Sequence, residues 1–328
     1  MENAESDSID LKAIGKQIQE WITEVETVIV GQKRFLERVL LALLCQGHLL
    51  VEGVPGLAKT LTLRTIAQTL QLSTKRIQFT PDLLPGDIIG TTIYEQKSGE
   101  FTIKKGPVFS HFILADEINR APAKVQSALL EAMQESQVTI GDTTFLLPRP
   151  FLVMATQNPI EQQGTYPLPE AQIDRFMMKI VLDYPTIAEE TKIVERMATM
   201  QNRWQIRPII SAEDLTKWQT IADATYISPK LIDYIIRLVH FTRNPAQLGF
   251  EWPKWIERGA SPRASIALVR LAKAHAFLQQ RQQVLPEDIK AIAIDTLRHR
   301  LTPNYEAEAE QITAADLIQR MLKELPLP

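Results

Sequence analysis

The chain has 328 residues, of which 45% are hydrophobic and 23% are charged, and this is enough for a sizeable core divided between two domains. Its 36 basic and 39 acidic side chains give a formal net charge of −3, so the sequence shows no overall electrostatic attraction toward nucleic acid or an anionic membrane. The longest uncharged stretch, residues 39–51, is too short to span a bilayer, and the acidic N-terminus lacks a signal-peptide pattern, so we expect a cytoplasmic protein without membrane insertion.

The N-terminal part of the chain predicts two helices. Residues 1–8 are polar and acidic, and we expect them to be disordered. Apolar residues recur at helical intervals between residues 9 and 30, which predicts the first helix. The second, over residues 32–45, carries the only cysteine, Cys45, which we expect to pack in the core. The five histidines lack metal-ligand spacing and cysteine partners, so the sequence does not predict a zinc site.

Five short apolar runs then predict strands, with helical segments between most of them. They cover residues 48–51, 76–79, 112–115, 151–155 and 177–182. Strands that alternate with helices favour a parallel sheet covered on both faces. Ligands of such sheets bind at the carboxyl ends of the strands, where Gly53, Asp116 and the polar residues 156–158 fall. Three strand ends are therefore expected to converge on one site.

Two segments do not fit a minimal α/β sheet. Residues 91–103 form two alternating arms around residues 97–99, and residues 137–146 bracket Gly141 and Asp142 in the same manner. Both segments predict β-hairpins inserted into the α/β core. Such hairpins serve either as contact surfaces for partners or as caps of a sheet edge, and the sequence favours neither role.

Helix patterns dominate after Pro185. Ser211, Ser228 and Ser261 each provide a helix N-cap, and in the last two cases a proline follows at the first helical position. Each cap precedes an apolar stripe of helical period. The sequence therefore predicts a second, helical domain that begins near residue 186.

A phosphate-binding loop is predicted at residues 53–60, which read Gly-Val-Pro-Gly-Leu-Ala-Lys-Thr between the first strand and a helix-forming stretch that begins at Leu61. A strand end, inward-pointing backbone N–H groups and a helix N-terminus together form an anion cradle. In such a loop Lys59 binds the outer phosphates and the hydroxyl of Thr60 can hold magnesium. Ala58 stands where glycine is usual, and its methyl group fits if its φ is negative.

The second half of a nucleotide site is predicted at Asp116 and Glu117, which directly follow the buried strand 112–115. A carboxylate at this end of a strand reaches the magnesium ion of a bound nucleotide. Taken alone, the two acids could simply begin a solvated helix. Together with the upstream loop, they favour a nucleoside triphosphatase.

Six sequence blocks are more specific than these two features. They are residues 52–60 (Glu-Gly-Val-Pro-Gly-Leu-Ala-Lys-Thr), 79–87 (Phe-Thr-Pro-Asp-Leu-Leu-Pro-Gly-Asp), 115–121 (Ala-Asp-Glu-Ile-Asn-Arg-Ala), 155–159 (Ala-Thr-Gln-Asn-Pro), 170–176 (Glu-Ala-Gln-Ile-Asp-Arg-Phe) and 259–264 (Gly-Ala-Ser-Pro-Arg-Ala). Together they resemble the MoxR family of AAA+ ATPases, and the resemblance runs from about residue 28 to the C-terminus. Within that family, alanine at position 58 is not unusual.

The resemblance implies a fold and a division of the chain. The fold is α/β, a P-loop AAA+ αβα sandwich with a five-stranded parallel sheet and inserted β-hairpins, followed by an all-α lid domain. We accordingly assign residues 1–27 to an N-terminal helical segment with a disordered start, residues 28–185 to the nucleotide-binding domain and residues 186–328 to the lid domain.

The resemblance also implies that ATP and magnesium are the cofactors. The residues expected to bind ATP are Val30, Gly31 and Gln32 around the adenine, Gly53, Val54, Pro55, Gly56, Leu57, Ala58, Lys59, Thr60 and Leu61 in the phosphate loop, and Asp116. Thr60 and Asp116 would position the magnesium ion.

Four further residues receive catalytic roles from the resemblance. Glu117 would orient and polarise the attacking water, because phosphoryl transfer depends on alignment and charge stabilisation. Asn158 matches sensor 1 and would hold that water from the other side. Arg175 resembles an arginine finger that completes the site of a neighbouring subunit. Arg263 matches sensor 2, so that the lid would close over the nucleotide. A surface ion pair is the alternative for each arginine, and the role of Arg120 stays open.

The function implied is Mg-dependent ATP hydrolysis by a homo-oligomeric ring, expected to be a hexamer, that drives chaperone-like remodelling or maturation of partner proteins, including metal-cofactor insertion. Proteins with a von Willebrand factor A domain are the expected partners. Two alternatives stay open at this stage. One is an AAA+ nucleic-acid motor or loader, which the balanced charge disfavours, and the other is a nucleotide-dependent binding switch with little turnover.

Overall fold

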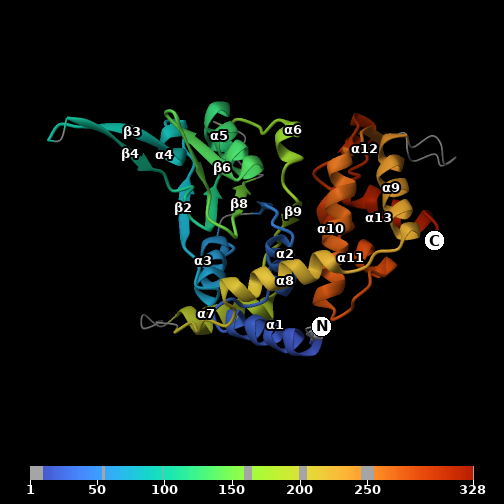
Figure 1. Ribbon diagram of the computed structural model, residues 1–328. Coiled ribbons are helices and arrows are strands. Elements are labelled where there is room, and N and C mark those ends of the chain that lie inside the picture. Colours follow the sequence, from blue (N-terminus) through green and yellow to red (C-terminus); the bar gives the residue numbers. More distant parts are fainter. Residues whose placement is uncertain are drawn as a thin grey trace, which may run out of the picture.

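The computed structural model describes residues 10–53, 56–97, 99–158, 165–198, 205–244 and 255–327. Its centre is a five-stranded parallel sheet with the strand order β2-β5-β8-β1-β9. Figure 1 labels β2, β8 and β9 of this sheet. The strands are β1 (Leu49–Glu52), β2 (Thr74–Gln78), β5 (Phe112–Asp116), β8 (Leu152–Gln157) and β9 (Met178–Val181). The predicted parallel sheet is confirmed, and each predicted strand lies within two residues of its observed position.

The two faces of the sheet belong to two hydrophobic clusters. On β5, Phe112 and Leu114 join one cluster, whereas Ile113 and Ala115 join the other. The first cluster includes α1 (Leu11–Glu26), α2 (Lys33–Leu44) and α3 (Lys59–Thr69), and the second includes α4 (Pro85–Ile89) and α5 (Ala123–Glu135). Because successive side chains of a strand point to opposite faces, the continuous apolar run of β5 is buried on both sides.

Both predicted hairpins are present. The first pairs β3 (Gly90–Glu95) with β4 (Glu100–Lys105), and the second pairs β6 (Gln137–Ile140) with β7 (Thr143–Leu146). In Figure 1 the β3–β4 hairpin projects away from the body of the molecule. At its base Gly90 has a φ of 106°, and a Cβ at this position would lie 2.4 Å from the carbonyl oxygen of Lys104, so only glycine fits.

The chain after Pro185 is mainly helical. Its helices are α7 (Ile187–Met197), α8 (Ala212–Ala224), α9 (Pro229–Arg243), α10 (Pro262–Leu278), α11 (Pro286–Leu297), α12 (Tyr305–Ala309) and α13 (Ala314–Glu324). The predicted N-caps are confirmed, since the side chains of Ser211, Ser228 and Ser261 each accept a hydrogen bond from the first turn of α8, α9 and α10. The short antiparallel pair β10 (Ile256–Arg258) and β11 (Thr302–Pro303) departs from the predicted all-α lid, because strands this short carry no alternating pattern.

One hydrophobic cluster joins the sheet to these helices. It includes α1, α2, one face of the sheet and the buried faces of α8, α9, α10, α11 and α13. Cys45, which follows α2, is buried in this cluster as expected. The helix α7 lies beside α1 (Figure 1), and Arg196 of α7 donates hydrogen bonds to the carbonyl oxygens of Glu26 and Thr27. The division of the chain near residue 185 stays a prediction.

Within the described part of the chain, no helix combines the length and the apolar character that a bilayer span requires. The expected disorder of residues 1–8 concerns residues that lie outside the described ranges.

Candidate nucleotide-binding site

A cavity of about 430 Å³ lies at the carboxyl ends of the neighbouring strands β5, β8 and β1. Its lining comes from the phosphate loop, from the ends of β5 and β8, and from β2. The lining residues are Gly53, Gly56, Leu57, Ala58, Lys59, Thr60, Leu61, Arg76, Asp116, Glu117, Thr156, Gln157 and Asn158. The predicted convergence of three strand ends on one place is therefore found in the structure, and we call this space the phosphate cavity.

The phosphate loop leads from β1 into α3. Lys59 is the first residue of α3, and its Nζ donates a hydrogen bond to the carbonyl oxygen of Gly53 at 2.7 Å. Burial lowers the pKa of Lys59, whereas the nearby carboxylates of Asp116, Glu117 and Glu52 oppose this shift. The ammonium group is thus close to Asp116, the last residue of β5, and to Glu117, which follows it. The predicted loop residues Val54 and Pro55 lie outside the described residues.

The backbone at Ala58 differs from the expectation that its φ is negative. Ala58 has a φ of 54° and a ψ of 21°, which is the left-handed conformation, at the N-cap of α3. A residue with a Cβ is strained in this region by roughly 1–2 kcal/mol. The condition that we set for an alanine here is therefore wrong, and the turn into α3 takes up a conformation that glycine would adopt more easily.

Asp116 ends β5, and both of its carboxylate oxygens accept hydrogen bonds. Its Oδ1 accepts a hydrogen bond from the hydroxyl of Thr156 at 2.6 Å, and its Oδ2 accepts two from the guanidinium of Arg76, at 2.6 and 3.1 Å. The hydroxyl of Thr156 in turn accepts a hydrogen bond from the backbone N–H of Glu117 at 2.9 Å. These bonds fix Asp116 and the start of the following turn relative to β8.

Glu117 follows Asp116 in a left-handed conformation, with a φ of 56°. Its Oε2 accepts a hydrogen bond from the side chain of Gln78 at 2.9 Å and lies 3.1 Å from Nε of Arg120. Arg120, whose role the sequence left open, therefore pairs with Glu117. A strained backbone that aims an acidic side chain into a cavity is a common feature of functional sites.

Sequence reasoning missed Arg76 and Gln78 on β2. Arg76 Nη2 also donates to the side-chain oxygen of Gln78 at 2.7 Å, so these two residues and the two acids form one network. Both belong to an edge strand, and their spacing of two places them on the same side of it. The signal that could have identified them is the alternation of these two long polar side chains with apolar ones in the predicted strand 76–79.

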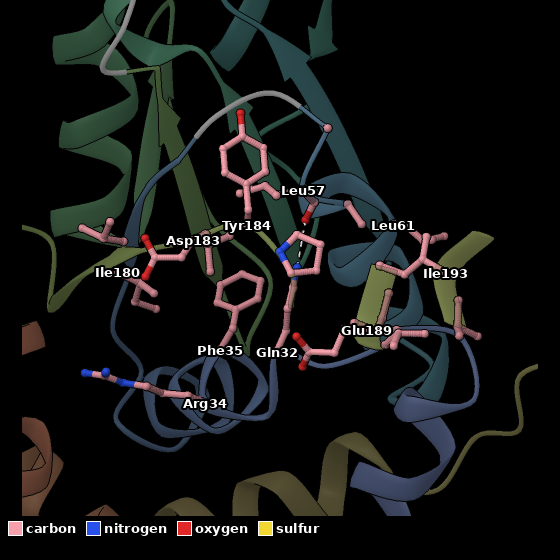
Figure 2. A pocket seen from close by; sticks show the side chains of 18 of the residues that line it. Gln32, Arg34, Phe35, Leu57, Leu61, Ile180, Asp183, Tyr184, Glu189 and Ile193 are labelled. Atoms are coloured by element: carbon pink, nitrogen blue, oxygen red, sulfur yellow. Dashed lines mark hydrogen bonds between the residues drawn. The ribbon is translucent and has the colours of Figure 1, made fainter. Parts of the chain in front are cut away.

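A second cavity of about 350 Å³ adjoins the phosphate cavity, because Gly56, Leu57, Ala58 and Leu61 line both. We call it the nucleoside cavity, and Figure 2 shows the side chains around it. Its walls are largely apolar and come from the segments around α2, α3, β9 and α7. They include Val28, Ile29, Val30, Phe35, Ile180, Leu182, Tyr184, Pro185 and Ile193.

Gln32 connects the nucleoside cavity to the phosphate loop. Its side-chain amide donates a hydrogen bond to the carbonyl oxygen of Leu57 at 3.1 Å, which Figure 2 shows as a dashed line. Of the three residues predicted to surround the adenine, Val30 and Gln32 line the cavity, whereas Gly31 is absent from its lining. Gly31 instead faces Glu189 of α7, since a Cβ on it would lie 2.4 Å from a carboxylate oxygen of that residue.

The helix α11 also reaches the nucleoside cavity, a contribution that the sequence did not predict. Asp295 and Arg298 line it. Asp295 is buried and accepts hydrogen bonds from Arg34 and Arg38 of α2, at 3.0 and 2.8 Å for the Oδ2 contacts. These ion pairs hold the end of α11 against the helix that forms the floor of the cavity.

Two predicted catalytic arginines lie elsewhere. Arg175 and Arg263 line neither the phosphate nor the nucleoside cavity but share a third cavity, of about 220 Å³, with Asp174 and Arg300. Arg263 lies 3.2 Å from Asp174 Oδ2. The guanidinium of Arg263 is paired with the acid next to Arg175 and lies outside both cavities, so the predicted sensor 2 role of Arg263 stays a prediction.

Comparisons with known proteins agree with this geometry. A model of the ATPase family associated with various cellular activities (AAA) matches residues 48–178, and an AAA lid domain model matches residues 254–321. Chaperone MoxR1 of Mycobacterium tuberculosis is 51% identical over 308 residues, which make up 94% of this chain and 81% of the relative. The chain belongs to the MoxR family of AAA ATPases. Protein MoxR of Paracoccus denitrificans is 33% identical, with 92% of this chain and 93% of the relative covered.

Solved structures support the same fold for this MoxR-family member. A crystal structure from Cytophaga hutchinsonii matches it with a TM-score of 0.92 and 54% sequence identity, over 97% of both chains. Membership of the family implies that the protein binds and hydrolyses ATP. The predicted family and the AAA fold with a helical lid are thus confirmed, and the roles of the individual site residues stay predictions.

Proposed function

We propose that this MoxR-family ATPase binds ATP across the two joined cavities and hydrolyses it with magnesium, in a ring of identical subunits. The observation that carries the proposal is the convergence of Lys59, Asp116 and Glu117 on the phosphate cavity. The loop and the start of α3 offer a positive charge and backbone N–H groups to the phosphates. The adenosine moiety would occupy the nucleoside cavity, whose apolar walls suit a flat base.

Magnesium fits the oxygen donors of the phosphate cavity. Thr60 and Asp116 both line this cavity and provide a hydroxyl and a carboxylate, which are the hard ligands that this ion prefers. When bound, the ion would neutralise charge on the outer phosphate oxygens. Asp116 is held by Arg76 and Thr156, so its position is set before any ligand arrives.

Glu117 and Asn158 would act on the water that attacks the outer phosphate. Both line the phosphate cavity, Glu117 from the end of β5 and Asn158 just beyond β8. We expect the Glu117 carboxylate to orient and polarise the water, with Gln78 and Arg120 fixing the direction of that carboxylate. Asn158 would hold the same water from the neighbouring strand.

The ring is inferred from the place of Arg175, because Arg76, which lines the phosphate cavity, is already bound to Asp116 and Gln78. Phosphoryl transfer is assisted by a rigid guanidinium near the outer phosphate, typically by about a thousandfold or more. Arg175 lines neither of the cavities that would hold ATP in its own chain. We therefore infer that Arg175 completes the site of the adjacent subunit, in a ring that we expect to be a hexamer.

The proposed output of the cycle is chaperone-like remodelling or maturation of partner proteins, including metal-cofactor insertion, with a von Willebrand factor A domain protein as the expected partner. Two observations support a role of this kind. The relative from Mycobacterium tuberculosis is named a chaperone. In addition, the projecting β3–β4 hairpin exposes Tyr94 by 56% and Phe101 by 73%, which is apolar area suited to protein contact.

A phosphate-release assay tests the catalytic part of the proposal. Glu117→Gln keeps the size of the side chain but removes the charge that polarises water, so we expect turnover to fall by roughly a hundredfold or more while ATP still binds. Glu131→Gln, an exposed position on α5, serves as the matched control and should keep the wild-type rate. Turnover of Glu117→Gln at the wild-type rate would contradict the proposal. Background rates of phosphate release in both the wild-type protein and Glu117→Gln would favour the nucleotide-dependent binding switch.

A further inference from the structure

The end of α11 and the residues that follow it contact both the nucleoside cavity and the segment around Arg175. Asp295 and Arg298 line the nucleoside cavity. His299 and Arg300, which follow directly, contact the segment around Arg175. A short, continuous piece of chain, residues 295–300, therefore lies between the place where this subunit would hold ATP and the arginine that it would offer to its neighbour.

Arg300 holds the backbone on both sides of Arg175. Its side chain is 3% exposed, and its Nη2 donates hydrogen bonds to the carbonyl oxygens of Asp174 and Phe176 at 3.0 and 2.7 Å. Its Nη1 also donates to the carbonyl oxygen of Met177 at 3.1 Å. The ring of His299 lies 2.9 Å from the carbonyl oxygen of Phe176. These hydrogen bonds to the carbonyl groups of residues 174, 176 and 177 fix the backbone conformation around Arg175.

The side chain of Asp174 forms a second link between the segment around Arg175 and the lid. Its Oδ1 accepts a hydrogen bond from Nε of Arg300 at 2.8 Å, and its Oδ2 accepts bonds from the Ser261 hydroxyl at 2.8 Å and from Arg263 at 3.2 Å. Both oxygens are thus bound by residues of the lid, at the N-terminus of α10 and after α11. Loss of Arg300 or Arg263 would leave the largely buried Asp174 carboxylate with one guanidinium partner instead of two.

Arg175 itself is less constrained. Its Nε is buried and has no hydrogen-bond partner among the described residues. The position of its side chain is therefore set mainly by the backbone of residues 174–176, which the lid holds. Because packed helices move as rigid units, a displacement of α11 by a ligand in the nucleoside cavity reaches this backbone directly.

We propose that Asp174 and Arg300 are positioning residues that set the place of Arg175 according to the state of the lid, so that the nucleotide held by one subunit controls the arginine that it presents to the next. The inference rests on the proposed action of Arg175 in the adjacent site. Asp174 and Arg300 do not line the phosphate cavity, so we infer that they act through the position of Arg175.

Mixed rings test the positioning. Asp174→Asn and Arg300→Gln are expected to bind ATP with wild-type affinity but to hydrolyse it at least about tenfold more slowly, since the guanidinium of Arg175 is displaced. Each variant keeps its own phosphate cavity intact. Mixing either one with Glu117→Gln, which keeps Arg175 in place, should give turnover several-fold above the sum of the two proteins measured separately. Misfolding would produce no such rescue.

Two comparison proteins make the result specific. Arg175→Ala serves as the reference and should show the same loss and the same rescue. Arg281→Gln breaks a different ion pair of the lid, with the buried Asp288, and should keep wild-type turnover. If Arg175→Ala hydrolyses ATP normally, the proposed finger fails. Suppose instead that Arg175→Ala loses ATP hydrolysis and is rescued by mixing. The positioning role is then overturned if Asp174→Asn and Arg300→Gln hydrolyse ATP at the wild-type rate, and also if they lose hydrolysis but are not rescued.

Hydrogen exchange tests the link to the nucleotide. The protein is studied at a dilution at which light scattering shows monomers, with Glu117→Gln preventing turnover. ATP should then slow or accelerate exchange in the peptide that covers residues 170–178, and the double variant Glu117→Gln, Arg300→Gln should lose this response while still binding ATP. Unchanged exchange in the Glu117→Gln protein at saturating ATP would overturn the proposed control by the nucleotide.

Discussion

Left-handed backbone at single residues is a feature of the candidate site. Gln32, Ala58 and Glu117 have φ values of 54°, 54° and 56°, and each lines one or both of the two cavities. None is a glycine, so each is held in a conformation that costs free energy. The surrounding contacts must offset that cost. In the described part of the chain, three of the eight non-glycine residues with a positive φ line the two cavities where ATP is proposed to bind.

Ala58→Gly tests this strain directly. Glycine adopts the left-handed region without a Cβ penalty, although it also gains freedom in the unfolded chain. We expect the free energy of unfolding of the nucleotide-free protein to rise by up to about 1 kcal/mol. The control Ala67→Gly, in the buried interior of α3, should instead lower it by about 1 kcal/mol or more. Denaturant unfolding measures both, and an equal loss in the two variants would contradict the account.

The site residues divide into those that local sequence identifies and those that it does not. Asp116 ends a strand, and Lys59 follows another strand after a short loop, so a pattern of a few residues places both at the same sheet edge. Arg76 reaches Asp116 across 40 positions, and Asp295 reaches Arg34 across 261. Such contacts depend on how the sheet and the lid pack, which no local pattern encodes.

At the level of elements, burial explains which strands the sequence locates well. β5 and β8 are buried along most of their length and appear as apolar runs. β2, an edge strand, has only Ile77 buried among its five residues, and the prediction of residues 76–79 was displaced from the observed Thr74–Gln78. A strand that lacks an apolar run offers little for a pattern to detect.

The β3–β4 hairpin is the element least supported by the body of the protein. Tyr94 and Phe101 pack on each other, with ring centroids 5.2 Å apart, yet both are exposed. We expect Tyr94→Ser and Phe101→Ser to change the free energy of unfolding by no more than about 0.5 kcal/mol and to leave ATP hydrolysis unchanged. Thermal unfolding and phosphate release measure the two effects.

A matched control for this prediction lies in the second hairpin. Val138 of β6 is 6% exposed, so Val138→Ser should cost about 1–3 kcal/mol. If the two variants of the first hairpin were as destabilising as Val138→Ser, that hairpin would pack against the body in solution, and its proposed availability to partners would be wrong.

At the scale of the whole molecule, sheet and lid share one hydrophobic cluster. Both parts line the nucleoside cavity, whereas the phosphate cavity is lined by residues between 53 and 158, and the two cavities meet at the phosphate loop. The end of α11 lines one side of the nucleoside cavity, so the lid would contribute to the proposed binding of the nucleotide there. With ATP in the proposed place, this arrangement would tie the nucleotide to the relative position of the sheet and the lid, which a ring ATPase needs in order to convert hydrolysis into movement.

The central claim is that the phosphate cavity at the ends of β1, β5 and β8 holds the triphosphate of ATP. Calorimetric titration of ATP into wild type and Lys59→Ala in the presence of magnesium tests it most directly. We expect Lys59→Ala to lose roughly a hundredfold or more in affinity, because a charged hydrogen bond to phosphate is removed, while circular dichroism shows an intact fold. Wild-type affinity in a folded Lys59→Ala protein would contradict the account.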